Sequence, residues 1–122
     1  MENDFDIRNG MLYKYTGTDE NVIIPDCVHM IYEKAFRGCE TVKSIEIPTS
    51  VTVIGWGAFS FCENLERLNL PSTLFMISIT AIEGCTKLKE IIMEENKCFY
   101  VKDNQIISKT DESYVISTGI VK

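Results

Sequence analysis

The pentapeptides AFRGC (35–39), AFSFC (58–62) and AIEGC (81–85) are three versions of one segment, and each begins 23 residues after the one before it. Self-similarity at a fixed period of a few tens of residues is the sequence signature of repeat architectures. The pentapeptides therefore predict a chain built from stacked turns of 23 residues.

Other positions recur with the same spacing, and most of them are apolar. A single turn of this length cannot bury its own apolar side, so turns must stack and each recurring position becomes one row of a shared core. The agreement of so many columns predicts a solenoid. The recurring columns are Pro25/Pro48/Pro71, Ala35/Ala58/Ala81, Cys39/Cys62/Cys85, Val28/Val51/Leu74, Ile31/Ile54/Ile77, Phe36/Phe59/Ile82, Val42/Leu65/Leu88, Ile45/Leu68/Ile91 and Ile47/Leu70/Met93.

Within each turn, the pattern predicts one strand and one corner. The segments IEIP (45–48) and LNLP (68–71) alternate apolar and polar residues, which indicates a strand with one buried face. Proline then ends the pairing, because it has no N–H to donate. The Ala–aromatic step is predicted to form the far corner of each turn, with Phe59 in the core.

The repeating pattern I-x-I-P-x-x-V-x-x-I-x-x-x-A-F-x-x-C-x-x-L resembles the BspA-like leucine-rich repeat family, from Val22 to about Met93. The resemblance implies an α/β fold: a short right-handed, horseshoe-like leucine-rich-repeat solenoid with strands lining one side. Members are mostly surface or secreted interaction proteins of bacteria and some protozoa. The resemblance thus implies protein–protein interaction, in surface adhesion or host contact.

Both ends of the chain carry a hairpin pattern. FDIRNGMLYK (5–14) has Asn9–Gly10 for a type I′ turn, and FYVKDNQIIS (99–108) matches it position by position, with Asn104 in place of Gly10. We expect a β-hairpin cap at each end; the alternative of a fragment from a longer array stays open. The predicted organisation is one leucine-rich-repeat domain, 1–122, with an N-terminal cap at 1–21, repeats at 22–93 and a C-terminal cap at 94–122.

Composition excludes several classes of function. A net charge of −6 argues against nucleic-acid binding, which needs clustered Lys and Arg. The longest apolar run, Leu74–Ile82, is too short to span a membrane. The first residues are acidic where a signal peptide is basic, which favours the cytoplasm, whereas the family resemblance implies the cell surface.

The five cysteines fit no closed disulfide framework. Three of them form the column Cys39/Cys62/Cys85, which lacks a tetrahedral arrangement and is predicted to be buried as small apolar groups. No metal or other cofactor is therefore expected. Cys27, two residues from the single histidine His29, and Cys98 lie off the column and leave a thiol enzyme as an alternative function. No catalytic motif accompanies them, so the chain is predicted to be non-catalytic.

The predicted strand face carries a row of alternating charge, Glu20/Lys43/Glu66/Lys89, which we expect to pair with itself. The neighbouring rows are expected to face outward, on the surface that commonly binds partners in leucine-rich repeats. Their candidate contact residues are Ser44, Arg67, Glu90, Glu46 and Asn69.

A second candidate surface is apolar. Trp56 and Ile79 share a column with Glu33, whose charge implies that the column faces outward. Phe61 replaces the glycine of the other turns, and Phe75 is the further candidate, beside Met76. We expect this surface to contact a protein partner or a second copy in a homodimer; burial of Phe75, Met76 and Ile79 under the C-terminal cap is the alternative. The chain is predicted to be a protein-binding module, or a structural, self-associating unit.

Overall fold

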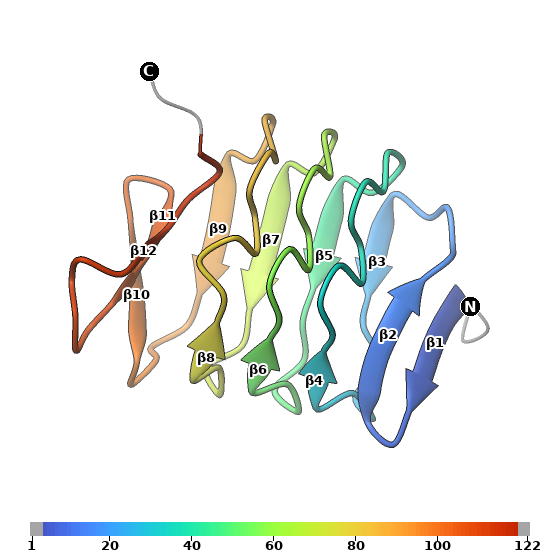
Figure 1. Cartoon of the computed structure of the whole chain (residues 1–122), viewed down its shortest axis with the longest axis horizontal. Helices are drawn as coiled ribbons and strands as arrows, with labels where there is room; N and C mark the ends of the chain where they lie inside the picture. The colour runs from blue at the N-terminus through green and yellow to red at the C-terminus, as the bar shows by residue number, and fades with distance from the viewer. Residues whose placement is uncertain (1–3, 120–122) are drawn as a thin grey trace.

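The computed structural model describes residues 4–119; the outermost parts of the two predicted caps, 1–3 and 120–122, lie outside it. Every regular element in the described range is a β-strand (Figure 1). The strands are β1 (Phe5–Arg8), β2 (Met11–Tyr15), β3 (Asn21–Ile23), β4 (Met30–Ile31), β5 (Ser44–Glu46), β6 (Val53–Ile54), β7 (Arg67–Leu70), β8 (Met76–Ile77), β9 (Glu90–Met93), β10 (Phe99–Lys102), β11 (Gln105–Ser108) and β12 (Val115–Ile116).

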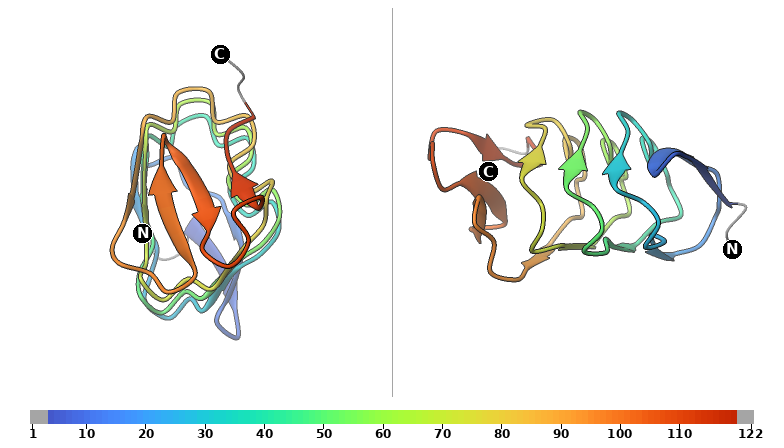
Figure 2. Two further views of the ribbon diagram at one scale, coloured as in Figure 1. Left: turned by 90° about the vertical axis from the view of Figure 1, so that its left-hand side faces the viewer. Right: turned by 90° about the horizontal axis from the view of Figure 1, so that it is seen from below.

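The chain coils into a β-solenoid whose turns superimpose when viewed along its length (Figure 2). One side is a four-stranded parallel sheet in the order β3-β5-β7-β9. The opposite side is a five-stranded sheet in the order β1-β2-β4-β6-β8. Residues 23 apart are partners in both, as in the pair Ile45 and Leu68 and the pair Ile54 and Ile77. The predicted 23-residue repeat is therefore confirmed.

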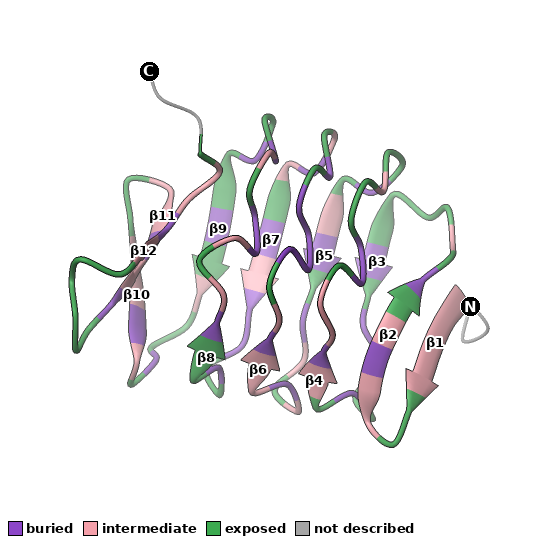
Figure 3. Ribbon diagram, viewed as in Figure 1, coloured by how far each residue is buried: buried purple, intermediate pink, exposed green. Residues whose placement is uncertain are grey.

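The core lies between the two sheets, and its rows are the apolar columns of the sequence. Bands of buried residues cross neighbouring turns at equal heights (Figure 3). The corner side chains Phe36 and Phe59 are fully buried, with ring centroids 5.4 Å apart. Tyr15 continues this row toward the N-terminus, stacked on Phe36 at 5.0 Å. The prediction that the corner aromatic belongs to the core is confirmed.

The expected α/β class is wrong, because residues 4–119 contain no α-helix. The hydrogen bonds of the corner give the reason. The amides of Ala35 and Arg37 donate to carbonyls three residues earlier, whereas those of Lys34, Phe36 and Gly38 donate to the next turn. A helix needs every amide for its own ladder. Sharing alternate amides between turns instead produces a β-solenoid with turns at its corners.

The N-terminal cap is the predicted hairpin. β1 and β2 pair antiparallel, with an irregularity in register between Asp6 and Ile7. Asn9 and Gly10 have φ angles of 50° and 79°, as a type I′ turn requires. β2 then pairs in parallel with β4, so the hairpin extends the five-stranded sheet.

The C-terminal cap is more than the predicted hairpin. β10 and β11 pair as expected, and Asp103 and Asn104 have φ angles of 53° and 58°. A third strand, β12, adds to β11, and the three strands form a sheet of their own. This strand was not predicted, because Val115–Ile116 is too short to show alternation.

Within residues 4–119, no helix is long and apolar enough to cross a membrane.

Candidate functional site

The charged row on the four-stranded sheet pairs with itself, as predicted. The Nζ atom of Lys43 lies 3.7 Å from Glu20 Oε2, and that of Lys89 lies 3.5 Å from Glu66 Oε1. Exposed ion pairs of this kind contribute only about 0–1 kcal/mol each. They nevertheless neutralise the row, so it presents no strong charge to a partner.

The neighbouring candidate row is also partly engaged. Arg67 Nε donates to Glu90 Oε1 at 2.5 Å, and Ser44 Oγ donates to Asn21 Oδ1 at 2.7 Å. Glu46 is exposed and Asn69 half-buried, and within residues 4–119 neither side chain has a hydrogen-bond or ion-pair partner. Of the strand-face candidates, only these two are unengaged.

The apolar candidates are exposed, which rules out burial of this surface under the C-terminal cap. Trp56 is 52% exposed and Ile79 50%, while Phe75 and Met76 are 53% and 55% exposed. β6 pairs with β8, and the Gly57 amide donates to Thr80 Oγ1 at 3.0 Å, so Trp56 and Ile79 lie on adjacent turns. We call Trp56, Phe75, Met76 and Ile79 the Trp56 surface.

Two turns approach each other closely at Gly55, directly before Trp56. A Cβ atom on Gly55 would lie 2.8 Å from the backbone nitrogen of Glu33, so this position needs glycine. On the outside, the Lys34 Nζ atom lies 4.7 Å from the centroid of the Trp56 ring. This cation–π contact steadies the ring while half of it stays accessible. The predicted exposure of Trp56 is confirmed.

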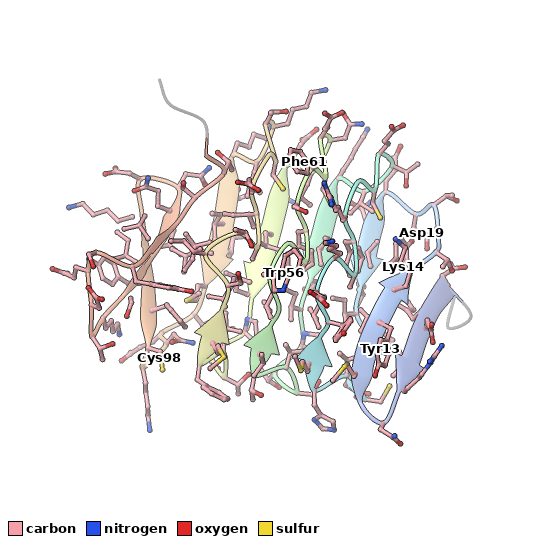
Figure 4. The ribbon with its side chains drawn as sticks, viewed as in Figure 1. Tyr13, Lys14, Asp19, Trp56, Phe61 and Cys98 are labelled. Carbon is pink, nitrogen blue, oxygen red and sulfur yellow. The ribbon has the colours of Figure 1, made fainter. Side chains whose placement is uncertain are left out.

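Phe61 is exposed at a different place. Figure 4 shows it at the upper corner of the turns, apart from Trp56. Its φ angle of 57° matches the positive φ of Gly38 and Gly84 in the same column. The ring lies over Gly84, where an added Cβ would clash with it, and Arg37 Cζ lies 5.3 Å from its centroid. Phe61 is therefore a separate corner feature.

The cysteine column is structural. Cys62 and Cys85 are fully buried, and their thiols donate to the carbonyls of Phe36 and Phe59 at 3.1 and 3.0 Å. Hydrogen bonding with Cys85, together with burial, raises the pKa of Cys62. Cys39 is only partly buried, which departs from the expectation; burial still raises its pKa, opposed by the charge of Lys14.

The two cysteines off the column lie far apart in the fold. Cys27 is exposed between β3 and β4, and Cys98 is half-buried just before β10. His29 is exposed, and its ring lies against Gly10. No hydrogen bond joins His29 to Cys27 in the described part of the chain. Within residues 4–119, no three His, Cys, Asp or Glu side chains come together as a metal site.

Sequence reasoning missed the residue that closes the last turn. Asn96 is 2% exposed, and its side-chain amide donates to the carbonyls of Ser72 and Leu74 at 2.9 and 2.8 Å. Its carbonyl oxygen accepts the amides of Cys98 and Phe99 at 2.7 and 2.9 Å. A signal was present, because Asn96 follows Thr73 by 23 residues, and Thr73 Oγ1 makes the equivalent bond to Val51.

A second missed feature is an aromatic pair at the N-terminal end. The rings of Tyr13 and Tyr32 lie 4.8 Å apart, and Arg8 Cζ lies 5.1 Å from the Tyr13 centroid. The charge of Glu33 raises the pKa of Tyr32. The 23-residue spacing does not predict this pair, because Tyr13 and Tyr32 are 19 residues apart.

With this architecture in view, the family assignment follows from the repeat itself. The family described as BspA type leucine rich repeat region matches residues 6–117 in six copies. The chain belongs to this family. Its match extends beyond the turns into both caps, so this leucine-rich-repeat chain has family sequence along nearly all of its length. No curated protein matches it.

Solved structures are similar to this chain. A leucine-rich repeat protein of T. pallidum has a TM-score of 0.70 and 31% identity, over 74% of this chain and 47% of the other. A leucine-rich cell surface protein of Faecalibacterium prausnitzii has a TM-score of 0.42 and 22% identity, over 92% of this chain and 39% of the other. A leucine-rich repeat protein of Eubacterium ventriosum has a TM-score of 0.38 and 15% identity, over 83% and 42%. The chain therefore spans less than half the length of each.

Proposed function

We propose that this chain is a non-catalytic protein-binding module and that the Trp56 surface makes its main contact. One observation carries the proposal: four large apolar side chains on the turns of β6 and β8 are each at least half exposed. Exposed apolar patches on soluble proteins mark contact sites, and Trp56 and Ile79 lie on adjacent turns. Tryptophan is enriched among the anchors of such sites, because it offers a large apolar area with few rotatable bonds.

The strand face is the weaker contact surface. Its row of charges is already paired, and Arg67 is held by Glu90. A partner there would replace existing interactions, whereas a partner on the Trp56 surface would remove apolar area from water. Lys34, above the Trp56 ring, adds a positive charge at the rim for an acidic residue of the partner. Phe61 and Arg37 form a separate contact at the corner.

The first test asks whether Trp56 is available in the free protein. A soluble quencher should reduce the fluorescence of Trp56, the only tryptophan, in a sample shown by sedimentation to be monomeric. A blue-shifted, quencher-resistant signal from a monomer would place the ring in the core. Protection that appears only in a dimer would assign the surface to a second copy.

The second test compares two variants of one tagged chain. Trp56→Ser should unfold at nearly the same denaturant concentration as the wild type. It should no longer capture the partner protein that the tagged wild type captures from a lysate. Arg67→Ser, on the strand face, should fold and keep that partner. Retention by Trp56→Ser together with loss by Arg67→Ser would reverse the assignment of surfaces.

A further inference from the structure

The four-stranded sheet ends in an open edge. β9 is its last strand, and β10 pairs with β11 instead of continuing the ladder. In the earlier turns, the backbone amides of Ile24 and Ile47 donate to the carbonyls of Glu46 and Asn69 on the following turn, both at 3.0 Å. Met93 occupies the same column. Within residues 4–119 no further turn receives its amide, so the outer edge of β9 keeps unused ladder donors and acceptors.

A groove runs along this edge. Its volume is about 540 Å³, and its walls are the whole of β9, residues 94–96, and Phe99, Tyr100 and Val101 of β10. The groove therefore lies between the last turn and the C-terminal cap. Ile92, one of its lining residues, is 38% exposed and gives the groove an exposed apolar side chain next to its free backbone groups.

The charge of the groove is negative. Glu94 and Glu95 are exposed, and neither carboxylate has an ion-pair partner among residues 4–119. Glu90 is already paired with Arg67. The groove's single lysine, Lys109, donates its ammonium to the Asn96 carbonyl at 2.5 Å. Lys109 keeps its positive charge, but with Glu90 neutralised by Arg67 the carboxylates of Glu94 and Glu95 outweigh it, so the lining has a net negative charge that favours a positively charged occupant.

We propose that this groove binds an extended, basic peptide segment of another protein, which adds a strand to β9. The free backbone groups of β9 would pair with the peptide. Side chains alternate in direction along a strand. An added strand of alternating apolar and basic residues would thus place its apolar side chains on the side of buried Ile91 and its basic side chains on the exposed side, near Glu94 and Glu95.

A second copy of the chain fits the groove less well. The cap lies across this end of the solenoid, where Tyr114 Oη donates to the Ile77 carbonyl at 2.9 Å and Gly84 donates to Thr118 at 2.8 Å. A whole domain cannot stack on the last turn without displacing the cap. A single extended segment needs only the groove.

The experiment uses synthetic peptides and the whole chain. An acetylated, amidated heptapeptide of alternating lysine and valine should bind and slow hydrogen exchange of the Ile91 and Met93 amides. The same peptide with every backbone amide N-methylated keeps its charges but cannot donate to a strand. It should bind roughly tenfold more weakly, because it loses its ladder hydrogen bonds.

Charge variants give a matched comparison. Glu94→Lys with Glu95→Lys should weaken binding, whereas Glu63→Lys with Glu83→Lys changes the net charge equally elsewhere and should leave binding unchanged. Trp56→Ser should also bind normally, since this inference is independent of the Trp56 surface. Equal binding of both peptides, unchanged exchange at Met93, or protection of Met93 by concentration-dependent dimerisation would each overturn the proposal.

Discussion

The two ends of the molecule begin from the same local pattern and are attached to the solenoid in different ways. Both hairpins turn through two residues of positive φ, and both bury one aliphatic side chain completely, Leu12 in β2 and Ile106 in β11. β2 joins the five-stranded sheet through backbone pairing with β4. β11 pairs only within the cap, with β10 and β12. Similar hairpins therefore need not make similar caps.

Chain direction explains the difference. The N-terminal hairpin enters the array through its second strand, so the carbonyls of Gly10 and Leu12 accept the amides of His29 and Tyr32 as a preceding turn would. At the other end, the strand that leaves the array is the first of its hairpin, and it folds back on β11. The last turn is closed mostly by side chains. Those that donate to its carbonyls are Asn96, Asn104 and Tyr114.

The largest expected loss of stability comes from a substitution in the core of the turns, between the two caps. Phe59→Ala should lower the free energy of unfolding by roughly 3–5 kcal/mol, because it opens a cavity in the fully buried corner row. Chemical denaturation measures this change. Both caps should lose protection together, since the row supports turns on either side. A loss below about 1 kcal/mol would contradict the placement of Phe59 in the core.

Asn96→Ala should have the next largest effect, and it should affect the C-terminal cap without affecting the N-terminal cap. It leaves the carbonyls of Ser72 and Leu74 and the amides of Cys98 and Phe99 without these partners, and the bonds to Leu74 and from Phe99 are buried. We expect a loss of roughly 2–4 kcal/mol. Hydrogen exchange should accelerate in β10 and β11 but not in β2.

Asn64→Ala is the matched control for this change. The Asn64 amide also donates to a backbone carbonyl, that of Glu40, but the bond is exposed to water. Its removal should cost much less than the removal of Asn96. If exchange rose equally in β2 and β11 after Asn96→Ala, the caps would be coupled and the contrast between them would fail.

Tyr114→Phe sharpens the comparison with a smaller change. It removes only the hydroxyl that donates to the Ile77 carbonyl at 2.9 Å, so the free energy of unfolding should fall by about 1 kcal/mol. The loss should appear as local opening of β12 in hydrogen exchange. Tyr100→Phe, which removes an exposed bond to Glu112, is the control and should have less effect. No difference between the two variants would mean that Tyr114 does not hold the cap.

The smallest effect concerns accessibility along the cysteine column. In the native protein, a thiol reagent should modify Cys39 before Cys62 and Cys85, because Cys39 is only half-buried at its end of the column. Exposed Cys27 should react first of all. Peptide mapping by mass spectrometry after timed labelling gives the order, and all five should react alike once unfolded. Labelling of Cys62 before Cys39 would show that the stack opens in its middle.

The 23-residue spacing alone determined the solenoid, the partners on adjacent turns and the core rows. Equivalent residues of successive turns stack on one another, so core contacts between turns join residues at one constant spacing in the sequence. Local chemistry also predicted the two hairpin turns, from Asn9–Gly10 and Asp103–Asn104. The exposure of Trp56 followed from Glu33 in the same column.

Only the tertiary structure decided how the array ends and what fills the corner. The contact between Tyr114 and Ile77 joins residues that are 37 apart and belong to different columns. It therefore cannot be predicted from the 23-residue spacing. The absence of a helix at the corner depends on amides such as Phe36 being used by the next turn. The groove beside β9 likewise exists because the last turn of the repeat and the C-terminal cap outside it are held apart. Contacts within the repeat can be predicted from its spacing, but contacts with its ends depend on the shape that the turns have already formed.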